Sequence, residues 1–199
     1  MAGLELPLWR DGLVVCGVDE AGRGALAGPI VVGAVILPPG PHPFRDSKAC
    51  PPKTREALLA RLERTALAYA VGVAEAGEVD ALGVLKATHL AAHRALAALE
   101  ARPDHLITDY LFLETDLPLT AVPKAEEKSV TVAAASILAK VTRDRIMREL
   151  DRAYPGYGFA QHKGYGTRAH LEALARLGPS PVHRRRFAPV AQAPLFTDP

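Results

Sequence analysis

The chain has 199 residues, 49% of them hydrophobic and 23% charged, and its formal net charge of +2 is too small to identify a nucleic-acid-binding protein. The two cysteines, Cys16 and Cys50, form no C-x-x-C pair, which excludes a disulfide framework and a cysteine-rich zinc site. Residues 1–13 lack the apolar run of a signal peptide and no apolar stretch is long enough to span a bilayer, so we expect a monomeric cytoplasmic protein without membrane contact.

The first part of the chain predicts β-strands. Residues 14–18 form a short apolar run that stops at Asp19-Glu20. After a glycine-rich segment, residues 30–37 are rich in β-branched side chains, which is typical of a buried strand. Residues 68–75 alternate weakly between apolar and polar side chains and predict a third strand.

Helices alternate with short strands in the rest of the chain. The pattern predicts helices over residues 52–66, 84–100, 130–153 and 167–177, and strands over residues 105–108 and 119–123. This order indicates an α/β fold with a mixed central sheet flanked by helices and a helical C-terminal extension. We expect one domain over residues 14–190, preceded by an N-terminal extension at 1–13 and followed by a flexible tail at 191–199.

Acidic residues stand at the ends of two predicted strands. Asp19 and Glu20 end the first strand, and Asp109 ends the strand that begins at residue 105. Two adjacent carboxylates cannot both be buried without a cation, and Mg²⁺ and Mn²⁺ prefer carboxylate oxygens. A shared metal site is one interpretation. Solvated acids at a strand-end turn are the other, and spacing alone leaves both open.

Two other candidate sites fail on context. Gly22-x-Gly24 follows a strand, as in a dinucleotide-binding loop, but a second strand follows it where that motif requires a helix. His89 and His93 have zinc-ligand spacing on a predicted helix, but neither a metalloprotease glutamate nor a third ligand accompanies them.

A set of motifs follows in chain order. They are residues 17–24 (GVDEAGRG), 26–29 (LAGP), 46–48 (DSK), 133–141 (AAASILAKV) with Arg143-Asp144, 163–167 (KGYGT) with His170, and 178–187 (GPSPVHRRRF). One such motif is a weak signal, whereas the ordered set is specific. Over residues 14–190 the chain resembles the ribonuclease HII family.

The resemblance implies a ribonuclease H-like fold and an endonuclease. Such an enzyme cuts the RNA strand of RNA–DNA hybrids and the 5′ side of ribonucleotides in duplex DNA, and it leaves a 3′-hydroxyl and a 5′-phosphate. The family holds two Mg²⁺ or Mn²⁺ ions with four carboxylates. Asp19, Glu20 and Asp109 match three of them, and the paired ions activate water and stabilise the leaving oxygen.

The resemblance also implies which residues bind substrate. The Gly22-Arg23-Gly24 turn reads the 2′-hydroxyl through its backbone, which glycine allows to come close. Tyr165 packs on the next, deoxy, sugar, and Lys48 contacts phosphate. The basic run 184–186 is a further candidate for phosphate contact, although a run of charge is usually just solvated.

Three positions depart from the family pattern. Ala25 replaces the usual proline, and Tyr110 stands where glycine is common. Residues 124–127 read Lys-Ala-Glu-Glu where the family has Lys-Gly-Asp, which places Glu126 on the fourth aspartate and leaves Glu127 as a weaker candidate. Our hypothesis is an active enzyme that uses Glu126, with an altered Mn²⁺ dependence.

Other functional classes remain beside this one. A hybrid-binding protein without turnover would explain the changed fourth acid. Ribonuclease HIII usually has an additional N-terminal domain, and an unrelated metal phosphatase would not explain Gly22-Arg23-Gly24 together with Tyr165. In the tail, residues 192–196 (QAPLF) resemble peptides that dock on the replication sliding clamp, against the alternative of an ordinary tail.

Overall fold

A mixed five-stranded sheet forms the centre of the computed structural model, which describes residues 3–193. The strand order is β3-β2-β1-β4-β5, and β1 pairs antiparallel with β2 and parallel with β4. The strands are β1 (Val15–Ala21), β2 (Ile30–Ile36), β3 (Ala68–Ala74), β4 (His105–Asp109) and β5 (Leu119–Val122). The predicted fold class, with its mixed sheet, is confirmed.

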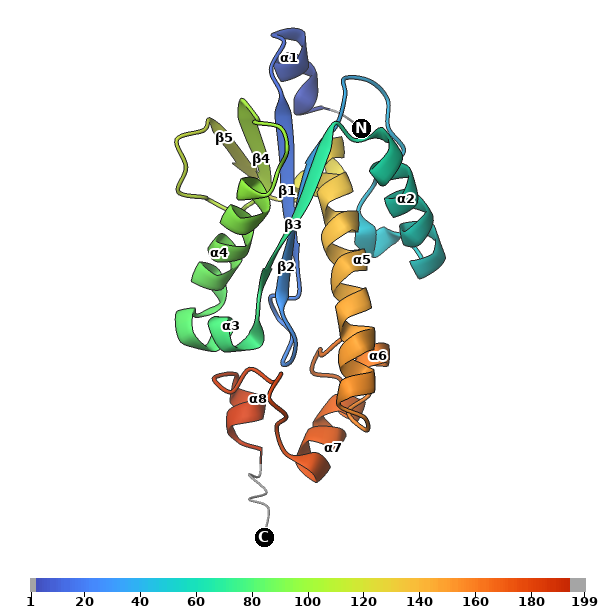
Figure 1. Ribbon diagram of the computed structural model, residues 1–199, viewed down its shortest axis with the longest axis vertical. Helices are drawn as coiled ribbons and strands as arrows, with labels where there is room; N and C mark the ends of the chain where they lie inside the picture. The colour runs from blue at the N-terminus through green and yellow to red at the C-terminus, as the bar shows by residue number, and fades with distance from the viewer. Residues whose placement is uncertain (1–2, 194–199) are drawn as a thin grey trace.

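Helices cover both faces of the sheet. They are α1 (Glu5–Arg10), α2 (Pro52–Thr65), α3 (Ala76–Leu82), α4 (Val84–Ala97), α5 (Val130–Ala153), α6 (Phe159–His162), α7 (Arg168–Leu177) and α8 (Ala188–Ala191), with short 3₁₀ turns at Ser47–Ala49 and Ala125–Glu127. Figure 1 shows α3 and α4 on one side of the sheet, α2 and α5 on the other, and α6 to α8 gathered beyond one end. The four helices expected from the sequence are present, whereas α1, α3, α6 and α8 are additional.

Helix α5 lies directly on the sheet because glycine removes the side chains between them. Gly17 of β1 faces the backbone of Thr131, and Gly33 of β2 faces the backbone of Ala135. A methyl group at Gly17 would overlap backbone atoms of the helix. The fully buried alanines at 133–135 complete this close packing. The position of α5 relative to the strands is therefore set by main-chain contact.

The opposite face gives a stability prediction. Gly72 of β3 lies against Ala91 of α4, and an added Cβ would overlap the Ala91 carbonyl oxygen. Gly72→Ala is expected to lower the free energy of unfolding by about 3 kcal/mol, as overpacking of a tight interface does, measured by urea denaturation. Gly77→Ala is the control, because nothing lies within 4 Å of its added methyl group. An equal effect of the two substitutions would contradict the packing argument.

Helix α1 is tied to the beginning of α5 by one buried side chain. Glu5 is fully buried, and its Oε1 accepts hydrogen bonds from Ser129 Oγ at 2.5 Å, Thr131 N at 2.9 Å and Thr131 Oγ1 at 2.8 Å. The segment before β1 therefore helps to hold the N-terminus of α5, where backbone N–H groups need acceptors.

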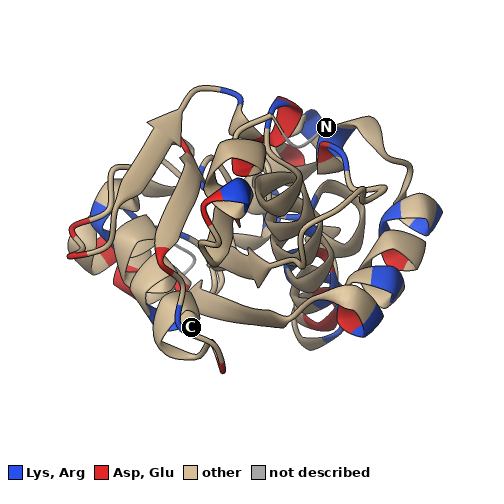
Figure 2. Cartoon of the chain, turned by 90° about the horizontal axis from the view of Figure 1, so that it is seen from above, with Lys and Arg blue, Asp and Glu red and all other residues tan. Residues whose placement is uncertain are grey.

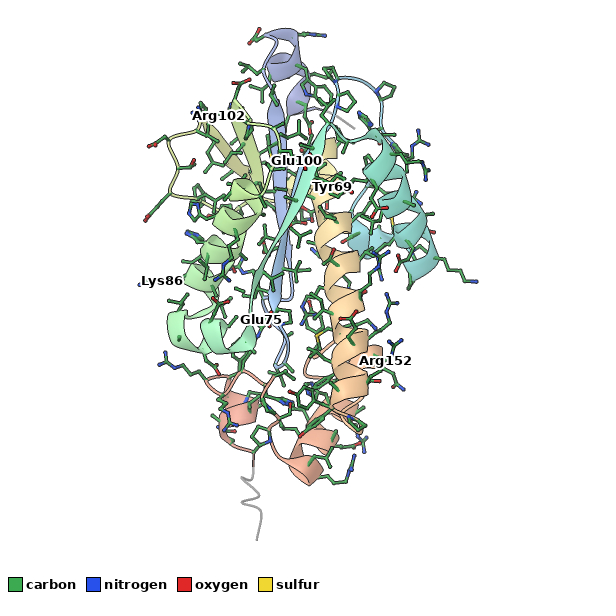
Figure 3. All side chains as sticks on the ribbon, viewed as in Figure 1. Tyr69, Glu75, Lys86, Glu100, Arg102 and Arg152 are labelled. Carbon is green, nitrogen blue, oxygen red and sulfur yellow. The ribbon has the colours of Figure 1, made fainter. Side chains whose placement is uncertain are left out.

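Charged side chains are spread over the outside. Figure 2 shows acidic and basic residues interspersed along the helices, and in Figure 3 Lys86 lies at the outer edge of the ribbon beside α4. Within residues 3–193, no helix has the length and apolar character needed to cross a membrane. Cys16 and Cys50 are buried free thiols, as the absence of a disulfide framework predicts.

Candidate active site

Parallel pairing of β1 with β4 brings two acidic residues to the same edge of the sheet. Val18 is paired with Thr108, so Asp19 and Asp109, each one residue further on, are level with each other. Asp19 is only 7% exposed, and its Oδ1 accepts a hydrogen bond from the backbone N–H of Glu20 at 2.8 Å. The carboxyl ends of neighbouring parallel strands are where functional groups gather in α/β sheets.

Glu126 reaches the same place from a different direction. It lies in the 3₁₀ turn Ala125–Glu127, and the backbone N–H of Ala125 donates to Asp109 Oδ1 at 3.2 Å. The Glu126 residue is 5% exposed, and Lys48 Nζ lies 3.8 Å from its Oε1. The side chain of Glu127 is 56% exposed and pairs with Lys124. Of the two glutamates, Glu126 is the one beside Asp109.

Burial and mutual repulsion perturb the acids of this cluster. The pKa of Asp19 is raised well above its ordinary value, first by burial and then by the charge of Glu20. Burial also raises the pKa of Glu20 and of Glu126, and the charge of Asp109 adds to both effects. Crowded, buried carboxylates of this kind are typical of sites where a cation binds.

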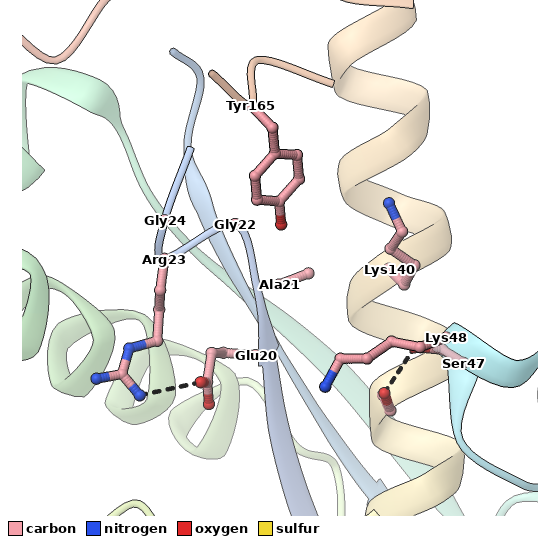
Figure 4. Close-up of a pocket in the computed structure, with 10 residues that line it drawn as sticks. Glu20, Ala21, Gly22, Arg23, Gly24, Ser47, Lys48, Lys140 and Tyr165 are labelled. Carbon is pink, nitrogen blue, oxygen red and sulfur yellow. Dashed lines mark hydrogen bonds and ion pairs between the residues drawn. The ribbon is translucent and has the colours of Figure 1, made fainter. Parts of the chain in front are cut away.

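A cavity of about 230 Å³ opens beside the carboxylates. Figure 4 shows Glu20 and Lys48 on one side of it and Tyr165 on another, with Gly22 and Gly24 between them. The turn at residues 22–24 is compact, since Ala25 N donates to Gly22 O at 3.3 Å and Gly22 has a φ of +98°. The cavity thus joins the acidic cluster to the two elements expected to read the sugars.

Ser136 and Lys140 also line this cavity, although the amino-acid sequence alone indicates no function for them. Both lie on α5, one helical turn apart. The Ser136 hydroxyl lies 2.8 Å from Ser47 Oγ, and Ser136 lowers the pKa of Asp19 against the larger, raising effect of burial. Their spacing in the alanine-rich motif is the signal that could have identified them as residues on the site face of the helix.

The expected phosphate contact of residues 184–186 is wrong for Arg184. Its side chain is fully buried, and its guanidinium donates hydrogen bonds to the carbonyl oxygens of Gly28 and Arg23. Arg184 is therefore held inside the protein and has no surface to offer to a phosphate. The charge of a residue does not show whether its side chain is buried. The carbonyl oxygens that accept hydrogen bonds from Arg184 belong to residues far away in the chain, so this contact could not be predicted from the basic run.

Two departures from the family pattern have local consequences. Ala25 is fully buried beneath the turn, so the missing proline is replaced by a packed small residue. Tyr110 has a φ of +52° and is 64% exposed, with its ring at the edge of Phe112. Tyr110 thus adopts the left-handed backbone conformation that favours glycine, and its ring lies outside the acidic cluster.

The chemistry of the cluster suits a divalent cation. Glu20 and Glu126 each keep one buried carboxylate oxygen without a hydrogen-bond partner, and such oxygens are the ligands that Mg²⁺ and Mn²⁺ prefer. Within the described residues, no three His, Cys, Asp or Glu side chains are already gathered around one point. Glu20 Oε1 pairs with Arg23 at 3.2 Å and Glu126 Oε1 with Lys48 at 3.8 Å, so the unpaired oxygen of each carboxylate is its Oε2.

Comparisons with known proteins identify the family of this chain. The family model described as ribonuclease HII matches residues 16–190. A ribonuclease HII from Thermus thermophilus is 72% identical over 192 residues, covering 96% of this chain and 95% of the relative. Among solved structures, the ribonuclease H2 from Pyrococcus horikoshii has a TM-score of 0.75 at 27% identity, covering 89% of this chain and 95% of that one. A ribonuclease HII from Archaeoglobus fulgidus, solved in complex with PCNA, has a TM-score of 0.71 at 26% identity over 88% of this chain and 95% of that one. The chain belongs to the ribonuclease HII family.

Proposed function

We propose that the chain is an endonuclease that cuts the RNA strand of RNA–DNA hybrids and the 5′ side of ribonucleotides embedded in duplex DNA, and so serves ribonucleotide removal in replication and repair. Membership of the ribonuclease HII family supports ribonuclease H activity in general terms. One observation carries the proposal: Glu20 of the acidic cluster lines the same cavity as the glycine turn at residues 22–24 and the ring of Tyr165.

The proposed metal ligands are Asp19, Glu20, Asp109 and Glu126. The raised pKa of three of these carboxyls and the unpaired oxygens of Glu20 and Glu126 support the assignment. Two bound Mg²⁺ or Mn²⁺ ions would supply an activated water and charge stabilisation at the leaving oxygen. That the ions are Mg²⁺ or Mn²⁺ is part of this proposal.

The chain's own residues orient the substrate. Lys48 lies at the mouth of the cavity beside Glu126, where its ammonium group is placed to pair with a phosphate. The pKa of Lys48 is raised, because its partial burial, which lowers the pKa, is outweighed by the carboxylates of Glu126 and Asp19. Lys48 therefore stays protonated and offsets negative charge both in the cluster and on the bound strand.

Sugar recognition is assigned to Gly22, Arg23, Gly24 and Tyr165. The backbone of the turn is accessible from the cavity, and no side chain stands over Gly24. The 2′-hydroxyl is the group that separates RNA from DNA. Tyr165 is 38% exposed across the cavity from Glu20, which leaves its ring free to pack on the following sugar.

The experiment is cleavage of an end-labelled DNA duplex containing one ribonucleotide, with Mg²⁺, Mn²⁺ or EDTA. We expect a metal-dependent cut on the 5′ side of the ribonucleotide that leaves a 3′-hydroxyl. An all-DNA duplex of the same sequence is the control and should remain intact. Tight binding without a cut in either metal would contradict the proposal and would favour a protein that only binds hybrids.

The proposed clamp-docking peptide at residues 192–196 extends beyond the described residues. The Archaeoglobus fulgidus protein, solved as a complex with PCNA, supports a clamp partner for this chain as well. Two apolar anchors in a short segment suit a hydrophobic pocket. We expect purified sliding clamp to retain the wild-type chain and to release the double variant Leu195→Ala/Phe196→Ala. Equal retention of the two proteins would contradict this partner.

A further inference from the structure

Two buried arginines lie behind the cavity. Arg143 of α5 and Arg184 are both fully buried. Burial lowers the pKa of both, that of Arg184 to about 10, so the Arg184 guanidinium still carries its charge at neutral pH. A buried charge is unfavourable unless its donors are satisfied. The partners of these two side chains therefore show what they hold in place.

Both guanidinium groups donate to backbone carbonyl oxygens of one segment. Arg143 donates from Nε to Pro29 O at 2.9 Å and from Nη2 to Ala27 O at 3.1 Å. Arg184 donates from Nη1 to Arg23 O at 2.9 Å and from Nη2 to Gly28 O at 2.9 Å. The backbone from residue 23 to residue 29 is thus fixed from two sides. We call residues 22–24 the reading turn.

Arg143 makes one further bond that Arg184 does not. Its Nη1 donates to Lys163 O at 2.9 Å, and its Cζ lies 5.4 Å from the centre of the Tyr165 ring. Arg184 instead lies against the ring of Phe187, at 5.4 Å. We call residues 163–167 the sensor loop, since they carry Tyr165. Arg143 therefore bonds both to the segment that follows the reading turn and to the sensor loop.

Contact between Arg143 and the reading turn is direct. A Cβ at Gly22 would overlap Nε of Arg143, so the arginine occupies the space that any other residue at position 22 would fill. The backbone that follows the reading turn also meets the sensor loop, because Leu26 N donates to Gly164 O at 2.8 Å. A change in the guanidinium therefore moves the reading turn, the Tyr165 ring, or both.

We propose that Arg143 is a positioning residue that sets the distance between the reading turn and Tyr165, and thereby the preference for a ribonucleotide–deoxyribonucleotide junction over a continuous RNA strand. This inference rests on the proposed function. Its physical basis is the planar fork of the guanidinium, which bonds three carbonyls in fixed directions and also stacks on a ring. A lysine keeps the charge and loses the fork.

The test measures kcat/KM on two duplexes of one sequence, with a single ribonucleotide in one and a complete RNA strand in the other. Arg143→Lys is expected to lower the single-ribonucleotide to hybrid ratio about tenfold, since misplacement by a fraction of an ångström is enough for such a loss. Arg184→Lys disturbs only the reading turn, which serves both substrates, so both rates should fall together. A ratio for Arg143→Lys within about twofold of the wild-type ratio overturns the proposal.

Matched controls separate positioning from general damage. Arg145→Lys changes the same residue type on the same helix, but Arg145 is half exposed and pairs with Glu56, so both rates should be unchanged. Tyr165→Ala should lower the ratio by itself, and adding Arg143→Lys to it should lower the ratio no further. Additive losses in the double variant would show that Arg143 does not act through Tyr165.

A measurement on the unaltered chain covers the case in which Arg143→Lys does not fold. The Nε–H resonance of Arg143 should shift further when the single-ribonucleotide duplex binds in EDTA than when the hybrid binds. Equal shifts would overturn the proposal. A wild-type chain that cuts neither duplex contradicts the proposed function instead, and the comparison of shifts then still decides the role of Arg143.

Discussion

Asp19→Asn is expected to lower kcat by about 10³-fold or more while raising the melting temperature of the metal-free protein. The two directions have one cause. Asp19 is buried beside Glu20, and both its burial and that neighbour raise its pKa. A carboxyl whose pKa is raised in the folded state destabilises the fold at pH values where it is ionised, so the neutral amide relieves the strain. The same substitution removes a charge that a divalent ion requires.

Both properties are measurable on one preparation. Single-turnover cleavage of the duplex with one ribonucleotide gives the rate, and thermal unfolding in EDTA gives the stability. Asp116→Asn is the matched control, because Asp116 is exposed in the loop before β5, at the end of the sheet away from Asp109. A loss of activity in Asp19→Asn accompanied by a lower melting temperature would contradict a metal-binding role and indicate a structural one.

Glu126→Ala is expected to lower cleavage about 10²-fold, whereas Glu127→Ala should change it less than about twofold. Glu126 is buried, with one carboxylate oxygen unpaired and Asp109 close enough to raise its pKa. Glu127 is exposed and paired with Lys124, an arrangement that contributes little. Rates in Mg²⁺ and in Mn²⁺ with saturating duplex provide the measurement.

Substitution of Glu126 by aspartate separates the effect of side-chain length from the effect of charge. Glu126→Asp keeps the carboxylate and withdraws it by one methylene, so we expect cleavage to persist with a changed ratio of the Mn²⁺ rate to the Mg²⁺ rate. Full activity of Glu126→Ala in both metals would reject Glu126 as a ligand. Full activity of Glu126→Ala together with loss in Glu127→Ala would transfer the role to the neighbouring residue.

The strands and long helices were predictable because their patterns are local. Residues 130–153 repeat apolar side chains at helical spacing, and proline and glycine follow the end of the helix. Short helices have too few residues to show such a pattern. Helix α1 has six residues and depends on Glu5 bonding to Ser129 and Thr131, a contact across more than half of the chain. Local sequence contains no record of that contact.

The site was predictable only in part, for a related reason. Strand-end position identified Asp19 and Asp109 as candidates, but their closeness depends on the parallel pairing of β1 with β4. Glu126 was identified as a candidate only through its match to a family motif, because the residues around it show no pattern that indicates a metal ligand. Arg184 stands in a basic run that is usually solvated, whereas the carbonyls that accept hydrogen bonds from it and from Arg143 belong to residues far away in the chain.

Helix α5 sets the spacing between the residues that contact the different parts of the site. Ser136, Lys140, Arg143 and Met147 follow at helical spacing, and in that order they meet Asp19, the cavity, the reading turn and Gly28. Ser136 and Arg143 are separated by about 10 Å along the helix axis. Deleting one residue between them would rotate the far end by about 100° and turn Arg143 away from its carbonyls. The separation between the acidic cluster and the reading turn is thus set by the number of helical residues between them.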